Sequence, residues 1–203
     1  MKPFKILSCL ILLLLSGCIA KEDYQIIISS GANKAEILAS KEIRRYIYLR
    51  TGELLPIIQT DAPSQIMSSI IIATKKQELL KGIYDLPSSE FQNLKEQEFI
   101  LKSYTDGRQL SLFIIGGGSA GVLYGAYQFA EEIGIRFYLD GDVVPDNKQS
   151  LTLPVLNDKS SPLFELRGIL PFHDFPEGPD WWNLDDYKAI IGQLSKLKMN
   201  FIG

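Results

Sequence analysis

The chain has 203 residues, and its 24 acidic residues slightly outnumber its 21 basic ones, giving a formal net charge of −3. A mildly acidic chain without a basic run is not suited to the phosphates of nucleic acid, so we exclude nucleic acid as a partner. The two cysteines, Cys9 and Cys18, both lie close to the N-terminus. No thiol is therefore left for a disulfide, a metal site or a nucleophile in the rest of the chain, and we expect no metal or other cofactor.

Residues 1–17 are typical of a secretory signal. Lys2 and Lys5 precede an apolar run over residues 6–15, which is too short to cross a bilayer as a helix. Residues 15–18 (LSGC) resemble the lipobox of bacterial lipoproteins, in which the cysteine receives diacylglycerol and becomes the new N-terminus. We therefore expect residues 1–17 to be a signal peptide and Cys18 to carry lipid, with a plain signal peptide or a short membrane anchor as the alternative.

Residues 18–23 are expected to be a short surface tether. Lys21, Glu22 and Asp23 resemble the signal that sends some lipoproteins to the outer face of the outer membrane, although three charged residues can also be an ordinary solvated tether. Acyl chains contribute about 0.8 kcal/mol of membrane affinity per CH₂, so a lipid on Cys18 would hold the protein without a transmembrane helix. The expected location is the cell surface, anchored to the outer membrane by lipid.

Residues 24–97 contain three short strands and one long helix. Strands are expected at residues 24–29, 54–58 and 69–74. A capping box formed by Asn33 and Glu36 predicts a helix over 34–51, which Gly52 ends. The polar stretch over residues 75–97, after the third strand, has room for one or two helical turns.

Residues 98–139 continue with a hairpin, a helix and a strand. Asp106-Gly107 predicts an antiparallel hairpin of strands 98–104 and 109–115. A second apolar stripe predicts a helix over 119–133, followed by a last strand at 135–139. Together these elements predict an α+β domain over residues 24–153, with two helices on one side of a mixed sheet of five or six strands. The Pro-rich segment 154–161 is expected to be a linker.

Three glycines give the chain an alternative function. Gly116, Gly118 and Gly121 match the spacing of a dinucleotide-binding loop, and Asp140 follows at the end of the next expected strand. In such a loop, the helix N-terminus binds pyrophosphate and the acid binds ribose. The order of elements opposes this, because a hairpin precedes the loop and a Pro-rich segment follows it. We expect these glycines to allow close packing of the helix on the sheet.

The elements predicted for residues 162–203 follow the order found at the start of a parallel barrel. Residues 164–172 are strand-like, 184–198 form a predicted helix, and 200–203 begin a second strand. So short a segment cannot bury a core of its own. We therefore expect a truncated (β/α)₈ barrel that starts at about Pro162 and continues beyond Gly203.

Two stretches make the chain similar to known enzymes. Residues 114–127 (IIGGGSAGVLYGAY) and 131–142 (EEIGIRFYLDGD) resemble the N-terminal domain of family 67 α-glucuronidases and family 20 β-N-acetylhexosaminidases. Residues 162–168 (PLFELRG) are similar to the first barrel strand of those enzymes. The resemblance implies a two-domain glycoside hydrolase with a non-catalytic first domain and catalytic carboxylates beyond Gly203. It also implies that Arg167 holds sugar hydroxyls, while residues 169–175 depart from both families.

The expected sugar contacts lie in and beside the loop after the first barrel strand, where barrel enzymes build their sites. This loop, residues 173–183, holds the single histidine, three acids and adjacent tryptophans, a mixture that suits stacking on sugar rings and hydrogen bonding to hydroxyls. The alternative is structural, with one tryptophan packing under the helix and Asp180 or Asn183 capping it. The candidate substrate-binding residues are Arg167, His173, Asp174, Trp181 and Trp182, with Asp174 also a possible catalytic acid.

The favoured function is therefore the N-terminal fragment of a surface-anchored glycoside hydrolase for polysaccharide breakdown. The fragment itself is expected to be inactive, with the α+β domain as a support for the barrel. A glycan-binding surface lipoprotein without catalysis is one alternative, and a nucleotide-binding domain is another.

Overall fold

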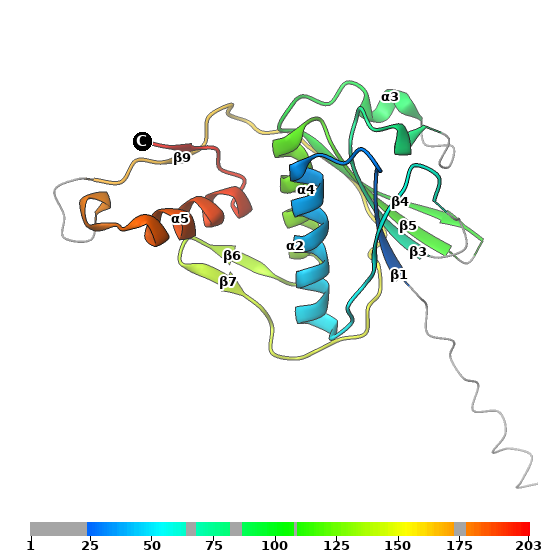
Figure 1. Cartoon of the computed structure of the whole chain (residues 1–203), viewed down its shortest axis with the longest axis horizontal. Helices are drawn as coiled ribbons and strands as arrows, with labels where there is room; N and C mark the ends of the chain where they lie inside the picture. The colour runs from blue at the N-terminus through cyan, green and yellow to red at the C-terminus, as the bar shows by residue number, and fades with distance from the viewer. Residues whose placement is uncertain (1–23, 64–67, 82–86, 108, 173–177) are drawn as a thin grey trace, which may run out of the picture.

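The computed structural model describes residues 24–63, 68–81, 87–107, 109–172 and 178–203. Its centre is a six-stranded sheet with the strand order β2-β1-β3-β5-β4-β8 (Figure 1). β1, β2, β3 and β5 run parallel, whereas β4 is antiparallel to both of its neighbours. The bounds are β1 Tyr24–Ile28, β2 Ile57–Gln59, β3 Ser68–Thr74, β4 Phe99–Asp106, β5 Gln109–Gly116 and β8 Asn157–Ser160. The predicted α+β fold with a mixed sheet is confirmed.

Two long helices cover one face of this sheet, as predicted (Figure 1). α2 (Lys34–Thr51) begins with the expected capping box, in which Asn33 accepts from the backbone of Glu36 and the Glu36 carboxylate accepts from the backbone of Asn33. It ends at Gly52, whose φ of 81° is in the left-handed region that favours glycine. The second helix, α4 (Ser119–Glu132), lies beside α2.

Apolar side chains alternate between the two faces of the sheet, so that each face has its own core. Ile26, Ile70 and Ile72 pack with α2 and α4 in the larger core. Ile27 and Ile71 point to the other face, which is covered by the segment that follows β3. That segment contains the 3-10 turn η2 (Glu78–Leu80) and the short helix α3 (Ser88–Phe91), which matches the expected one or two helical turns. A sheet covered on both faces explains why the parallel strands are nearly continuously apolar.

The predicted hairpin at Asp106-Gly107 is also confirmed. β4 and β5 pair antiparallel over their full length, from Phe99 opposite Gly116 to Asp106 opposite Gln109. Gly107 has a φ of 62°, which is the conformation that this kind of tight turn requires.

Two expectations about the sheet need correction. The strand expected at 135–139 is β6 (Arg136–Tyr138), which pairs with β7 (Gly141–Val143) in a separate two-stranded ribbon and not in the main sheet. The sixth strand of the sheet is instead β8, which lies in the segment 154–161 that was expected to be a linker. β8 is a polar edge strand (NDKS) held to β4 through backbone pairing, so no apolar alternation marks it in the sequence.

The stretch between β7 and β8 is tied back onto the domain by a buried arginine. Arg50, at the end of α2, is 7% exposed. Its guanidinium donates to the carbonyl oxygens of Ile133 at 2.8 Å and Asn147 at 2.6 Å and to the side chain of Gln149 at 2.9 Å. These bonds satisfy the buried charge and fix the return path of the chain toward β8.

Residues 162–203 form a small strand–helix–strand unit at the side of the helices that faces away from the sheet (Figure 1). β9 (Gly168–Ile169) and β10 (Phe201–Ile202) pair parallel, and α5 (Leu184–Lys196) connects them. The helix matches the predicted one, whereas both strands are shorter than the expected strand-like stretches. A parallel pair joined through a helix is the repeating unit of a (β/α) fold.

Among the described residues, none of the helices combines the length and the apolar character needed to cross a membrane. No cluster of three or more potential metal-binding side chains occurs in that part of the chain either.

Candidate functional site

The glycine-rich turn between β5 and α4 is filled by the protein's own backbone. The amide of Gly117 donates to the carbonyl oxygen of Glu98 at 2.8 Å, and the amide of Gly121 donates to that of Glu96 at 3.0 Å. These are the amide groups that a dinucleotide-binding loop would offer to pyrophosphate.

Close packing explains each of these glycines. A Cβ on Gly116 would lie 2.1 Å from the backbone nitrogen of Val122, and one on Gly121 would lie 2.3 Å from the carbonyl oxygen of Glu98. A Cβ on Gly118 would meet the side-chain carboxylate of Glu96. The carboxylate of Glu96 therefore stands at the N-terminus of α4, where the helix dipole favours an anion. Asp140 lies in the β6–β7 turn and not at the end of a parallel strand. The geometry favours the packing interpretation over nucleotide binding.

Arg167 joins the two parts of the chain. Its guanidinium donates to the carbonyl oxygens of Lys198 at 2.9 Å and Phe164 at 2.6 Å. It also lies over the ring of Tyr124 on α4, 5.7 Å from the ring centroid. Arg167 precedes β9 and so stands at the N-terminal end of that strand, opposite to the end at which barrel enzymes bind substrates. The contacts with Lys198, Phe164 and Tyr124 give Arg167 a structural role, and its expected sugar contact stays a prediction.

Two of the other predicted sugar contacts, His173 and Asp174, lie outside the described residues. The expected lipidation site Cys18, the signal peptide 1–17 and the tether 18–23 lie outside them as well. These assignments stay predictions.

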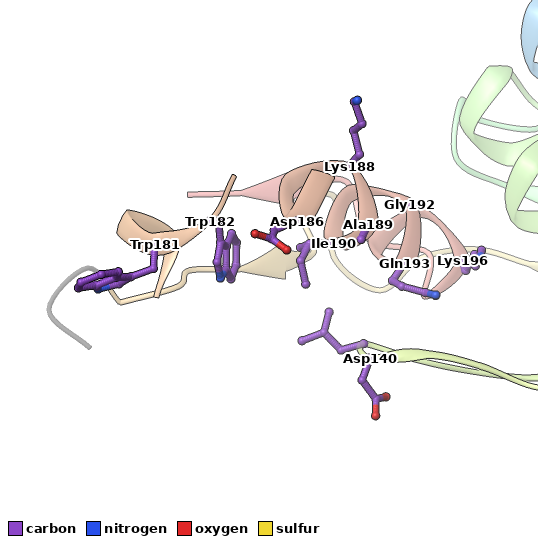
Figure 2. Close-up of a pocket in the computed structure, with 11 residues that line it drawn as sticks. Asp140, Trp181, Trp182, Asp186, Lys188, Ala189, Ile190, Gly192, Gln193 and Lys196 are labelled. Atoms are coloured by element: carbon purple, nitrogen blue, oxygen red, sulfur yellow. The ribbon is translucent and has the colours of Figure 1, made fainter. Parts of the chain in front are cut away.

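Trp181 and Trp182 stand at one end of a groove of about 610 Å³ between α5 and the turn that joins β6 to β7 (Figure 2). Trp181 ends the 3-10 turn η3 (Pro179–Trp181) and is 72% exposed. The ring of Trp182 packs edge-on against Tyr187 of α5, with 5.4 Å between ring centroids. Asn183 then caps α5 by accepting from the backbone of Asp186 and Asp185. The structural role expected for one tryptophan and for Asn183 is thus present.

A buried carboxylate, which sequence reasoning did not single out, holds α5 to the α+β domain. Asp142 of β7 accepts from the ammonium of Lys196 at 2.9 Å, from the hydroxyl of Tyr46 at 2.8 Å and from the amide of Gln193 at 3.2 Å. The side chains of Asp142 and Lys196 are only 11% and 13% exposed. We call these four side chains the Asp142 cluster. It joins α2, β7 and α5 at one point.

The ionisation of these groups follows from their surroundings. Burial alone would raise the pKa of Asp142, but the hydrogen bonds from Lys196, Tyr46 and Gln193 outweigh it and hold that pKa below its usual range. Burial, followed by the bond to Asp142, raises the pKa of Tyr46 far above its usual value. Burial also raises the pKa of the neighbouring Tyr127 to about 12. Asp142 is therefore charged and both tyrosines are neutral at physiological pH.

Further contacts extend the same junction along α4. Lys198 pairs with Glu131 at 2.8 Å, and the hydroxyl of Tyr124 donates to the carbonyl oxygen of Met199 at 3.3 Å. Leu197 packs against the larger core. Chemically, the junction fixes the position of the strand–helix–strand unit. Among the described residues of the junction, no two carboxylates face each other across an open cleft, which is the arrangement that glycosidic cleavage needs.

Comparison with known proteins places the fold. No curated protein matches the chain. Among solved structures, the family GH115 4-O-methyl-α-glucuronidase BtGH115A, with specificity for decorated arabinogalactans, is similar over 90% of this chain, with 18% identity and a TM-score of 0.56. CpGH84D is similar over 89% of the chain, with 12% identity and a TM-score of 0.54. The chain covers 25% and 26% of these two proteins, so it spans about a quarter of their length.

The family match agrees with the resemblance read from the glycine-rich turn and the helix that follows it. The model for "glycosyl hydrolase family 67 N-terminus" matches residues 18–129, a range that includes β1 to β5, α2 and most of α4. Because this match covers more than half of the chain, the protein belongs to the family of glycosyl hydrolase family 67 N-terminal domains.

Proposed function

We propose that the chain is the N-terminal part of a glycoside hydrolase in which the α+β domain supports a (β/α)₈ catalytic barrel. In this proposal, the barrel begins at about Pro162 and β9–α5–β10 is its first repeat. The observation that carries the proposal is the parallel pairing of β9 with β10 across α5, in a unit joined to a family 67 N-terminal domain. The α+β domain contributes position and not chemistry, through the Asp142 cluster and Arg167.

Exposed apolar side chains on the strand–helix–strand unit support the same assignment. Several large apolar side chains of residues 162–203 are mostly open to solvent. A group of exposed apolar side chains in one segment is unusual for a surface without a partner. A barrel would cover them with its neighbouring repeats. They are Leu163, Phe164, Leu166, Leu170, Phe172 and Leu184.

The substrate class in this proposal is a complex polysaccharide that carries uronic acid or hexosamine. BtGH115A, which shares the fold, is described as an α-glucuronidase specific for decorated arabinogalactans. The proposed location is the cell surface, with lipid on Cys18. Labelling with radioactive palmitate tests the anchor, because the label should enter the wild-type protein and not Cys18→Ser.

Hydrolysis assays on the complete protein test the function. We expect release of sugar from glucuronic-acid-decorated arabinogalactan or from a hexosamine glycan, and no release by residues 1–203 alone. Failure of the complete protein on both substrate types would refute the glycosidase assignment. Release by residues 1–203 would instead show that the catalytic groups lie within them.

A further inference from the structure

The open groove beside α5 has the size of a small-ligand site. Its volume of about 610 Å³ lies within the range of about 300 to 1,000 Å³ that is usual for such sites. One wall is α5, with Ala189 and Ile190, and the facing wall is Leu139 in the β6–β7 turn. The two tryptophans close one end (Figure 2).

The aromatic end of the groove is fixed before any ligand arrives. Trp182 is braced by Tyr187, whose hydroxyl donates to the carbonyl oxygen of Pro179 at 3.3 Å. That bond ties η3 to α5. Trp181 keeps 72% of its surface exposed next to this braced ring. An exposed indole on a rigid support can stack on the apolar face of a pyranose ring with little loss of conformational entropy.

The two walls keep their spacing because the Asp142 cluster joins them. Asp142 comes directly after the β6–β7 turn, close to Leu139 and Asp140 in the chain, and it holds Lys196 and Gln193 of α5. The groove is therefore a preformed feature of the junction, which is the usual state of small-ligand sites.

The charges around the groove select against an anionic ligand. Lys188 points away from the groove in Figure 2, and its ammonium pairs with Asp185 at 3.1 Å. The ammonium of Lys196 is occupied by Asp142. The carboxylate of Asp186 lies beside Trp182, and Asp140 stands on the rim. Because both described cations of the lining are paired, these acids would repel a uronate, but they can accept hydrogen bonds from neutral sugar hydroxyls.

We propose that this groove binds a neutral oligosaccharide, with one pyranose ring stacked on Trp181 and the hydroxyls of another sugar unit, on the far side of Trp182, donating to Asp186. This inference goes beyond the proposed function, because binding here requires no catalytic carboxylates. It assigns a glycan contact to a face shared by the α+β domain and the strand–helix–strand unit.

Intrinsic fluorescence is a direct test, because Trp181 and Trp182 are the only two tryptophans in the chain. The purified chain is titrated with cellohexaose, xylohexaose and hexagalacturonate. We expect a saturable change in tryptophan emission with at least one of the neutral sugars, at a Kd on the order of 0.1 mM, and none with hexagalacturonate. Trp182 still reports binding after Trp181→Ala.

Variants separate stacking from nonspecific effects. Trp181→Ala, at the aromatic end of the groove, and Leu139→Ala, on the wall that faces α5, should each weaken binding by about tenfold or more. Tyr48→Ala removes an exposed aromatic side chain of α2 outside the groove and should leave the Kd unchanged. No saturable signal with either neutral sugar, or equal binding by all three variants, would overturn the proposal. Tighter binding of hexagalacturonate than of the neutral sugars would overturn the claim that the ligand is neutral. Neither result bears on hydrolysis by the complete protein, so the two proposals fail separately.

Discussion

Residues 24–160 bury apolar side chains in two clusters, one on each face of the six-stranded sheet, whereas in the described part of residues 162–203 the only buried apolar side chain is Leu194. The first region has a core of its own. The second is held by contacts to the first, chiefly the Asp142 cluster, the Lys198–Glu131 pair and the ring contact of Arg167 with Tyr124. Family membership belongs to the first region, and the proposed catalytic architecture begins in the second.

This difference shows how a domain with its own core can position a segment that has none. A single strand–helix–strand unit is too small to bury a core, so its orientation depends on a partner surface. Here that surface is α4 with β7, and the contacts to it are polar as well as apolar. A domain of this kind can therefore set where the strand–helix–strand unit lies.

The largest expected difference in stability is between alanine substitutions at two glycines, one in each region. Gly121→Ala places a Cβ 2.3 Å from the carbonyl oxygen of Glu98 and should lower the free energy of unfolding by about 4 kcal/mol or more, because backbone must shift. Gly192→Ala on α5 meets nothing within 4 Å and should raise helix stability by about 1 kcal/mol or less. Urea denaturation of both variants measures the contrast. A similar loss of stability at both positions would contradict it.

Isoleucine truncation sharpens the comparison next. Ile72→Ala, in the larger core, should cost about 3 to 4 kcal/mol in unfolding free energy, because it removes fully buried methyl groups and leaves a cavity. Ile191→Ala, at a residue that is 53% exposed, should cost about 1 kcal/mol or less. Thermal or urea unfolding gives both values. Equal costs would mean that α5 is buried in solution by contacts not seen in this fold.

Breaking the Asp142 cluster should have an intermediate effect. At pH 7, Asp142→Asn should lower the unfolding free energy by about 2 kcal/mol, since it removes a charged acceptor from Lys196 and Tyr46. Lys196→Met serves as the partner variant. A double-mutant cycle should show strong coupling between the two positions. Additive effects would show that the pair does not stabilise the junction.

The lowered pKa of Asp142 predicts that the stabilisation by its carboxylate depends on pH. The pKa of Asp142 is lower in the folded protein than its ordinary value of 3.8, so its stabilisation is complete above that value and is lost as pH falls through the folded pKa. The stability difference between wild type and Asp142→Asn should therefore be constant above pH 3.8 and shrink as the pH falls below it. Thermal unfolding of both proteins across this range checks it. A difference that instead grows as the pH falls would contradict a lowered pKa for Asp142.

The smallest expected effect is at the hydroxyl of Tyr124. Tyr124→Phe removes one long hydrogen bond to the carbonyl oxygen of Met199 but keeps the ring under Arg167. The cost in unfolding free energy, measured by urea denaturation, should be about 1 kcal/mol or less. If Tyr124→Phe lowered the unfolding free energy more than Asp142→Asn, the main contact of the junction would be with α4 and not with β7.

Sequence reasoning found the elements that carry local signals. The Asn33–Glu36 capping box, the Gly52 end of α2 and the Asp106-Gly107 hairpin each depend on a few neighbouring residues, and each is present. The packing interpretation of the glycine-rich turn also agrees with the geometry, because it follows from the steric size of a Cβ.

Long-range features left weaker traces. β8 has four polar residues and pairs only through its backbone, so it could not be told from a linker. Asp142 lies 96 residues from Tyr46 and 54 from Lys196, and no local pattern connects them. Its only trace in the sequence is the Gly141-Asp142 pair that forms part of the family resemblance. The contacts of Arg167 with Tyr124 and Lys198 left no trace either, because a motif fixes its neighbours and not the direction of its guanidinium.

Amide hydrogen exchange tests the central claim, that residues 162–203 depend on docking to a domain with its own core. Amides of β3 should exchange only through global unfolding, whereas those of α5 should exchange through a smaller local opening. Asp142→Asn should increase the exchange of α5 much more than that of β3. Equal opening free energies in β3 and α5, with equal changes in the variant, would contradict the account.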